Sequence, residues 1–134
     1  MEEKVKKYIE SLGRRKAASA RVRLHHGGSG KIDINGRTLE TYLPLLTLRN
    51  AVVAPLKETG TQDLFDITVK VVGGGVRGQA DSIRLGIARG LIDFNPEFRG
   101  VLKKLGFLRQ DARRRERKKP GKKSARRSPQ WSKR

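Results

Sequence analysis

The sequence predicts one α+β domain followed by a long basic tail. Two kinds of apolar spacing alternate through the first 108 residues: every second residue, as in strands, and every third or fourth residue, as in helices. Beyond residue 108 the only large apolar side chain is Trp131. We therefore divide the chain into a compact domain (1–108) and an extended tail (109–134). The tail should be disordered when free, because it buries too little surface to offset its ordering entropy.

The first predicted strand covers residues 18–24, where small or apolar residues alternate with polar ones. Residues 31–34 alternate again and stop at Asn35-Gly36, a dipeptide typical of tight turns. Several glycines lie between the two stretches. The pattern predicts a hairpin from Arg21 to Asn35 with a glycine-rich loop.

A helical region and a further strand follow. From residue 38 to residue 56 the apolar spacing is helical, and Pro44 should divide this stretch into a short helix and a longer one. Residues 65–71 alternate most clearly of all, with four apolar side chains on one face. This strand should end at the three glycines 73–75.

Two more helices complete the predicted domain. Apolar residues between 80 and 94 share one helical face, as in an amphipathic helix. Asn95-Pro96-Glu97 then has the composition of a helix start: a cap, a first-position proline and an acid in the first turn. The short helix that it opens should run through Leu105 and end at Gly106.

The charge of the chain indicates a polyanionic partner. The sequence has 32 Lys and Arg against 13 Asp and Glu, a formal net charge of +19. The tail contributes +11 of this and the domain +8. A nucleic acid would relieve the self-repulsion and release its own counterions. An anionic membrane is the weaker alternative because the tail has no apolar face.

The sequence also excludes several kinds of site. It has no cysteine, so disulfides, thiolate zinc sites and cysteine nucleophiles are absent. No apolar run is long enough to span a bilayer, and the first ten residues lack a secretory signal, which favours a cytoplasmic protein. No grouping of side chains requires catalysis. We expect no enzyme activity, no cofactor, no metal and no small-molecule substrate.

One motif suggests an enzyme all the same. Residues 73–78 match the G-x-G-x-x-G pattern of dinucleotide-binding turns, between a predicted strand and a predicted helix. A dinucleotide site would also need a second parallel strand bearing an acid after the helix, and none follows. The alternative is a strand-to-helix turn where the backbone approaches another group closely, and Arg77 makes a phosphate one candidate.

His25 and His26 lie in the predicted glycine-rich loop and have no nearby third metal ligand. We interpret them as solvent-exposed loop residues.

Basic side chains supply the candidate nucleic-acid contacts. Arginine suits RNA because its planar guanidinium group binds phosphate oxygens and stacks on unpaired bases. Residues 14–16 should lie in a loop before the first strand, although a charged, exposed strand edge is the alternative. Trp131 either stacks on a base or is an isolated aromatic residue. The predicted rRNA-binding residues are Arg14, Arg15, Lys16, Arg21, Arg77, Arg113, Arg114, Arg117, Lys118, Lys119, Lys122, Lys123, Arg126, Arg127 and Trp131.

Several motifs in order along the chain resemble a known family, the small-subunit ribosomal protein S9 family of bacterial type. The motifs are Gly13-Arg14-Arg15-Lys16 with Ala20-Arg21-Val22, Val71-Val72-Gly73-Gly74-Gly75 with Gly78-Gln79-Ala80, Gly86-Ile87-Ala88-Arg89, and Ser128-Pro129-Gln130-Trp131-Ser132-Lys133-Arg134. The resemblance runs from about Tyr8 to Arg134. Trp131 departs from it in type, since the family more often has Phe or Tyr there.

The resemblance implies a non-catalytic component of the small ribosomal subunit. Its two-layer fold would resemble the second domain of ribosomal protein S5, with a left-handed βαβ crossover. Its partners would be the rRNA of the subunit head, the neighbouring head proteins and the anticodon stem-loop of P-site tRNA. Along the tail, Arg126 and Arg127 would contact rRNA, and Ser132, Lys133 and Arg134 would lie nearest the tRNA. Charge alone leaves one other possibility, a histone-like protein that compacts any nucleic acid.

Overall fold

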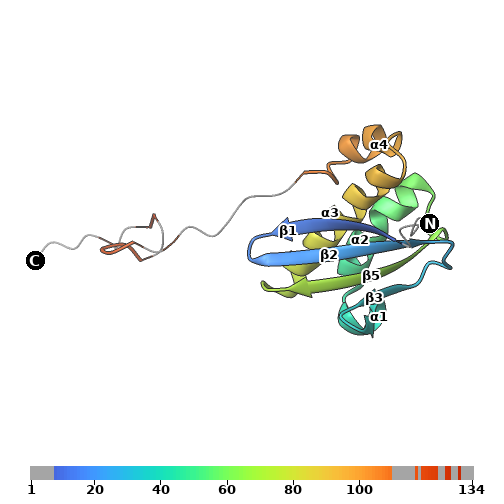
Figure 1. Ribbon diagram of the computed structural model, residues 1–134. Helices are drawn as coiled ribbons and strands as arrows, with labels where there is room; N and C mark the ends of the chain where they lie inside the picture. The colour runs from blue at the N-terminus through green and yellow to red at the C-terminus, as the bar shows by residue number, and fades with distance from the viewer. Residues whose placement is uncertain (1–7, 110–116, 118, 124–125, 128–129, 131–134) are drawn as a thin grey trace, which may run out of the picture.

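The computed structural model describes residues 8–109, 117, 119–123, 126, 127 and 130. It confirms the α+β class: a five-stranded sheet with helices against it (Figure 1). The elements in chain order are β1 (Ile9–Arg15), β2 (Ala18–His26), β3 (Ile32–Ile34), β4 (Arg37–Thr38), α1 (Leu39–Tyr42), α2 (Leu46–Thr59), β5 (Phe65–Val72), α3 (Val76–Phe94) and α4 (Phe98–Lys104).

The core lies between one face of the sheet and the helices. In β2 and β5 every second side chain is buried, as the alternation predicted, and Val22 faces Val69 across the two strands. The other side of the core comes from the helices, with Ile83 and Ile87 of α3 fully buried. Helices α2 and α3 lie behind the sheet in Figure 1, so the opposite face of the sheet is open.

The predicted hairpin from Arg21 to Asn35 is wrong. The strand order is β1-β2-β5-β3-β4, so β5 lies between β2 and β3. It pairs antiparallel with β2 and parallel with β3, which makes β3, α1, α2 and β5 a βαβ unit. Strand β5 buries four side chains, and its central place in the sheet lets it form backbone hydrogen bonds with a neighbouring strand on each side. The glycine loop therefore passes the start of β5 instead of making a tight turn, and both Gly27 and Gly28 donate N–H bonds to the Leu64 carbonyl.

Strand β1 was missed, and the loop predicted at residues 14–16 is mostly strand. Arg14 and Arg15 belong to β1, which pairs along its whole length with β2, and only Lys16 lies in the turn that follows. The alternative of a charged strand edge is the one observed, because β1 is an edge strand. The alternation was hidden because its most buried residue, Gly13, has no side chain to count.

The helices follow the predicted pattern with shifted ends. Pro44 separates α1 from α2 as predicted. Helix α2 runs on to Thr59 with Pro55 inside it, beyond the expected end. Helix α4 starts later than predicted: it begins at Phe98, Glu97 is its N-cap residue, and no acid lies in its first turn. The Asn95 Oδ1 atom instead accepts the Glu97 N–H at 3.1 Å in the turn before the helix. Gly106 ends α4 with a φ of +78°, which a glycine adopts without strain.

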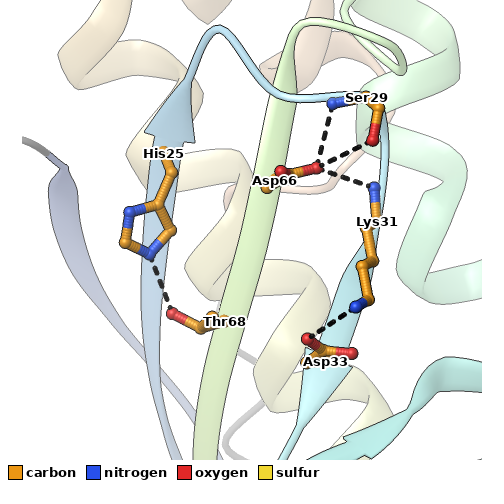
Figure 2. Close-up of polar contacts among 6 residues, drawn as sticks. All are labelled: His25, Ser29, Lys31, Asp33, Asp66 and Thr68. Atoms are coloured by element: carbon orange, nitrogen blue, oxygen red, sulfur yellow. Dashed lines mark hydrogen bonds and ion pairs between the residues drawn. The ribbon is translucent and has the colours of Figure 1, made fainter.

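The carboxylate of Asp66 closes the loop between β2 and β3. Its Oδ1 atom accepts the backbone N–H groups of Ser29 at 3.0 Å and Lys31 at 3.1 Å (Figure 2). These backbone hydrogen bonds, the one from Ser29 first, lower the pKa of Asp66 from its ordinary value of 3.8. The loop between β2 and β3 is thus held by Asp66, a charged side chain of β5, the strand that lies between β2 and β3.

Candidate nucleic-acid interface

The open face of the sheet carries a group of cationic side chains. In a strand, residues two apart share a face, so the side chains opposite the buried ones point outward from β1, β2 and β5. The cations among them are Arg14, Arg21, Arg23 and Lys70. Arg21 and Lys70 are direct partners in the pairing of β2 with β5. Like charges so placed repel each other, and a bound anion would relieve that repulsion.

Two of these arginines are held in place by neighbouring side chains. Arg21 makes an ion pair with Glu10 of β1 at 3.1 Å. The guanidinium group of Arg23 lies 4.8 Å from the centre of the Tyr8 ring, a cation–π contact. A depression of about 520 Å³ adjoins them, lined by backbone and side-chain atoms of Arg21, Arg23, Asn35, Gly36 and residues 68–72. The open face therefore combines cationic side chains, one of them paired with Glu10, with a concave surface.

The turn that holds Lys16 meets the segment that leads into α3 and Arg77 at one end of the sheet. Lys16 has a φ of +53° in the turn between β1 and β2 and is exposed. Arg77 is exposed in the first turn of α3. Both segments meet because Gly73 lies against the backbone of Ala17, so closely that a Cβ atom on Gly73 would be 2.4 Å from the Ala17 oxygen. The fold thus packs together the two segments that carry these predicted contacts, although Lys16 and Arg77 are 61 positions apart in the sequence.

Arg15 points the other way from Arg14. It lies on the helix side of β1, where its Nε atom is 3.6 Å from the Asp81 carboxylate of α3, and its side chain is only 13% exposed. In this position the guanidinium group joins the edge strand to the helix. Its predicted contact with rRNA has weaker geometric support than those of Arg14 and Lys16.

The glycine motif serves a contact within the domain. Gly73 and Gly74 have φ values of +76° and +68°, and both lie against the turn between β1 and β2. The Gln79 side chain holds this arrangement, because its Nε2 atom donates to the Gly73 carbonyl at 3.1 Å while its Oε1 atom accepts from the Tyr42 hydroxyl. No strand of the described residues follows α3, so the βαβ unit of a dinucleotide site is missing here. Close backbone approach, the alternative to a nucleotide site, is what the structure shows.

His25 and His26 are the last two residues of β2, and their placement in a loop was wrong. Figure 2 shows His25 on β2, where its Nε2 atom lies 3.1 Å from the Thr68 hydroxyl of β5. The His26 ring stacks on Phe94 with centroids 5.4 Å apart and meets the edge of Phe65. Pairing of β2 with β5 continues to the His26–Phe65 pair, which extends the strand past the expected end. Among the described residues, no group of His, Asp or Glu side chains is placed to hold a metal ion.

The structure describes part of the tail. Lys122 N–H donates to the Lys119 carbonyl at 3.1 Å across a turn in which Gly121 has a φ of +79°. The predicted contacts in this part are all exposed: Arg117, Lys119, Lys122, Lys123, Arg126 and Arg127. The other predicted contacts of the tail lie outside the described residues: Arg113, Arg114, Lys118, Trp131, Ser132, Lys133 and Arg134.

Sequence reasoning missed several exposed cations of the domain. Lys70 lies on the open face of β5, and its place in an alternating strand was a usable signal. A second group surrounds α4 and consists of Arg99, Lys103, Lys104 and Arg109. The signal for this group was four basic residues and no acid between 98 and 109. In the described part of the chain, no helix is both long and apolar enough to cross a lipid bilayer.

Comparison with known proteins gives consistent results. The family model of ribosomal protein S9/S16 matches residues 13–134. The small ribosomal subunit protein uS9 of Lawsonia intracellularis is 52% identical over 124 residues, which cover 92% of this chain and 95% of that protein. The protein of the same name from Azobacteroides pseudotrichonymphae is 49% identical over 126 residues, covering 94% and 98%. The chain therefore belongs to the ribosomal protein S9/S16 family and is a structural protein, not an enzyme.

Proposed function

We propose that the chain is a structural constituent of the small ribosomal subunit that binds rRNA of the subunit head. The observation that carries this proposal is the similarity, at about half of all positions and over nearly the whole chain, to proteins named for that subunit. The exposed cations of the open sheet face and of the tail support it, because each can neutralise a phosphate. The protein would act in translation, bound to ribosomes in the cytoplasm.

Two regions of the domain would contact the rRNA. Lys16 and Arg77 flank the glycine turn at one end of the sheet, and Arg14 and Arg21 lie on its open face. These side chains come from three elements and one turn of the same packed domain, so the backbone positions that carry them are fixed before binding. Preorganised contacts lose little conformational entropy when an RNA of matching shape binds. Neighbouring head proteins would complete the environment of the domain.

Co-sedimentation tests the assignment to the subunit. Ribosomal subunits are separated from cells of the source organism and washed in high salt at high magnesium concentration. We expect the protein in the small-subunit fraction, in about one copy per subunit. A histone-like protein would instead be released by salt, because its binding would be purely electrostatic. Absence from washed small subunits would contradict the proposed function.

We further propose that the tail follows the rRNA and ends at the anticodon stem-loop of P-site tRNA. Ser132, Lys133 and Arg134 would touch the tRNA, whereas Arg126 and Arg127 would touch rRNA. The supporting observation is the order of the tail: basic clusters separated by Pro120-Gly121 and Ser128-Pro129 suit an extended path. Before assembly the tail would have no fixed structure.

Removal of the last three residues tests the tRNA contact. Small subunits reconstituted with a chain lacking 132–134 should assemble normally but bind P-site tRNA about tenfold more weakly, a loss of about 1.4 kcal/mol. The matched control is Lys122→Gln with Lys123→Gln, which also removes two positive charges from the tail. It should leave the tRNA affinity unchanged. Equal tRNA affinity of the deleted and full-length chains would sink the tRNA contact without affecting the rRNA assignment.

The resemblance to the second domain of ribosomal protein S5 also leads us to propose a left-handed crossover in the β3–α1–α2–β5 unit. The parallel pairing of β3 with β5 supports a crossover, since two parallel neighbours need a connection that returns to the same end. An experimental structure of the assembled subunit would show the hand of the crossover directly.

A further inference from the structure

Helix α4 and the turn after it form a second basic surface on the domain. A groove of about 600 Å³ is lined there by Arg99, Lys103, Lys104, Leu105, Gly106, Leu108 and Arg109. We call this surface the α4 groove. All four of its cationic residues are exposed. None of them belongs to the open sheet face or to the glycine turn.

The positive charge of the α4 groove is uncompensated. Residues 98–109 contain four cations and no acid. Among the residues that the structure describes, no acidic side chain makes an ion pair with any of the four. Arg99 and Lys103 are four positions apart and so share a helix face, where like charges repel each other. A bound anion would remove this repulsion.

Helix stabilisation explains only part of this charge. Lys103 and Lys104 lie in the last turn of α4, where cations interact favourably with the helix dipole. Arg99 is the second residue of the helix, close to the positive end of the same dipole, where a cation is unfavourable. Its position is therefore better explained by a ligand than by the stability of α4.

The α4 groove is held rigidly by its apolar side. Leu102 of α4 is fully buried in the core, and Phe107 packs against the core just after the turn. The Phe107 N–H donates to the Leu102 carbonyl at 3.0 Å, and the Arg84 guanidinium group lies 5.6 Å from the centre of the Phe107 ring. The cations thus project from a fixed support, which reduces the entropy that binding must overcome.

The occupant that fits this surface is a sugar–phosphate backbone. The α4 groove leads into the tail at Arg109, which belongs to both. The positive charge of the groove is therefore continuous with the net +11 of residues 109–134. Leu105, 48% exposed, and Leu108 add apolar surface beside the cations, suited to the apolar faces of ribose and bases. We propose that the α4 groove binds the rRNA backbone and fixes the point from which the tail starts along the RNA. This proposal rests on the proposed function, since it assumes that the chain binds rRNA.

The test measures salt-dependent binding to a transcript of the head domain of small-subunit rRNA. The variant carries Arg99→Gln, Lys103→Gln and Lys104→Gln, and glutamine keeps the helix propensity. The slope of log affinity against log salt concentration should decrease in magnitude by about 2 to 3, since each lost phosphate contact contributes about 0.7–0.9. Affinity at moderate salt should fall at least tenfold. Circular dichroism should show unchanged folding.

The matched control removes three exposed cations outside the groove with Lys31→Gln, Arg37→Gln and Lys57→Gln. It should leave the slope within one unit of wild type. Equal losses in the two triple variants would overturn the α4 proposal, because they would reflect total charge only. An unchanged slope in the α4 variant would overturn it as well. Failure of the unmodified protein to bind the transcript would instead contradict the proposed function.

A cross-linking experiment tests the position directly. The chain has no cysteine, so Lys104→Cys introduces a single thiol for a photoactivatable cross-linker. In the assembled subunit this variant should cross-link to rRNA at one discrete site. Lys57→Cys, on the exposed last turn of α2, is the control and should give less than a tenth of that yield. Cross-links from Lys104→Cys that reach only protein would refute the proposed site.

Discussion

The contact between β1 and α3 makes Gly13→Ala the most informative single substitution. Gly13 faces α3, and a Cβ atom there would lie 1.8 Å from the Ser82 carbonyl oxygen and 2.6 Å from the Gly86 nitrogen. Both atoms are helix backbone, which cannot swing aside as a flexible side chain can. The φ of Gly13 is not positive, so alanine would add no backbone strain of its own. The effect is therefore purely one of space.

The size of the effect follows from the required displacement. Ordinary van der Waals contact begins near 3.4 Å, whereas the added Cβ atom would lie 1.8 Å from the Ser82 oxygen. Strand β1 and helix α3 would therefore have to move apart by about 1.6 Å. Overpacking of this kind costs about 1–3 kcal/mol. The separation also breaks the bond from the Ser11 hydroxyl to the Gly86 carbonyl and that from Arg89 to the Leu12 carbonyl, each worth about 0.5–1.5 kcal/mol. We expect a total loss of roughly 2–6 kcal/mol in the free energy of unfolding.

Urea and thermal unfolding measure this loss. A decrease of 3 kcal/mol should lower the melting temperature by at least about 12 °C in a domain of this size. The matched control is Gly100→Ala in α4, where a Cβ atom would meet nothing within 4 Å. That variant should be about 0.5–1 kcal/mol more stable than wild type, because alanine is the better helix former. A Gly13→Ala protein within 1 kcal/mol of wild type would refute the close contact.

Two further predictions concern the loops that close the sheet. Replacing Asp66 with Asn should lower the stability of the protein at neutral pH and flatten the dependence of that stability on pH. The folded-state pKa of Asp66 lies below its unfolded value of 3.8, so the contribution of Asp66 to stability is complete above about pH 5 and is lost as the pH falls through the folded-state pKa. Thermal unfolding between pH 7 and pH 2.5 measures this loss. Asn35 has a φ of +52° and its side-chain amide bonds both the N–H and the carbonyl of Val71 at 3.0 and 2.9 Å. Asn35→Ala should therefore destabilise by about 2–4 kcal/mol. Asn35→Gly should recover the part of this stability loss that comes from backbone strain at positive φ, but not the part that comes from the lost hydrogen bonds. Equal urea midpoints for the alanine and glycine variants would show that backbone strain does not contribute.

The elements of the fold could be predicted where apolar side chains mark them. Strand β5 and helix α3 were predicted because each buries a regular series of large side chains. Strand β1 was missed because its burial depends on Gly13, which leaves no apolar signal. The pairing of β2 with β5 was missed for another reason, since periodicity identifies a strand but not its neighbour.

The candidate interface was predictable to a similar degree. Arg14, Lys16 and Arg77 were predicted as contacts from local charge, but the packing of the segments that carry Lys16 and Arg77 depends on a turn that only the folded chain shows. Arg15 was grouped with Arg14 because they are adjacent, although adjacent residues of a strand face opposite sides and Arg15 pairs with Asp81. The cations of the α4 groove were passed over because the net +11 of the tail dominated the charge pattern.

The glycine motif shows why the same residues can indicate either an enzyme or a binding protein. A G-x-G-x-x-G turn permits close backbone approach, and in a dinucleotide site the approaching group is a pyrophosphate. Here the approaching group is the Ala17 backbone, 2.4 Å from a Cβ position on Gly73. The turn between β1 and β2 packs against the glycine turn here, so the segment that holds Lys16 lies against the segment that leads to Arg77. In the proposed RNA interface the absence of a side chain at Gly73 would contribute indirectly, because it lets the turn that holds Lys16 pack against the segment leading into α3, where Arg77 is exposed.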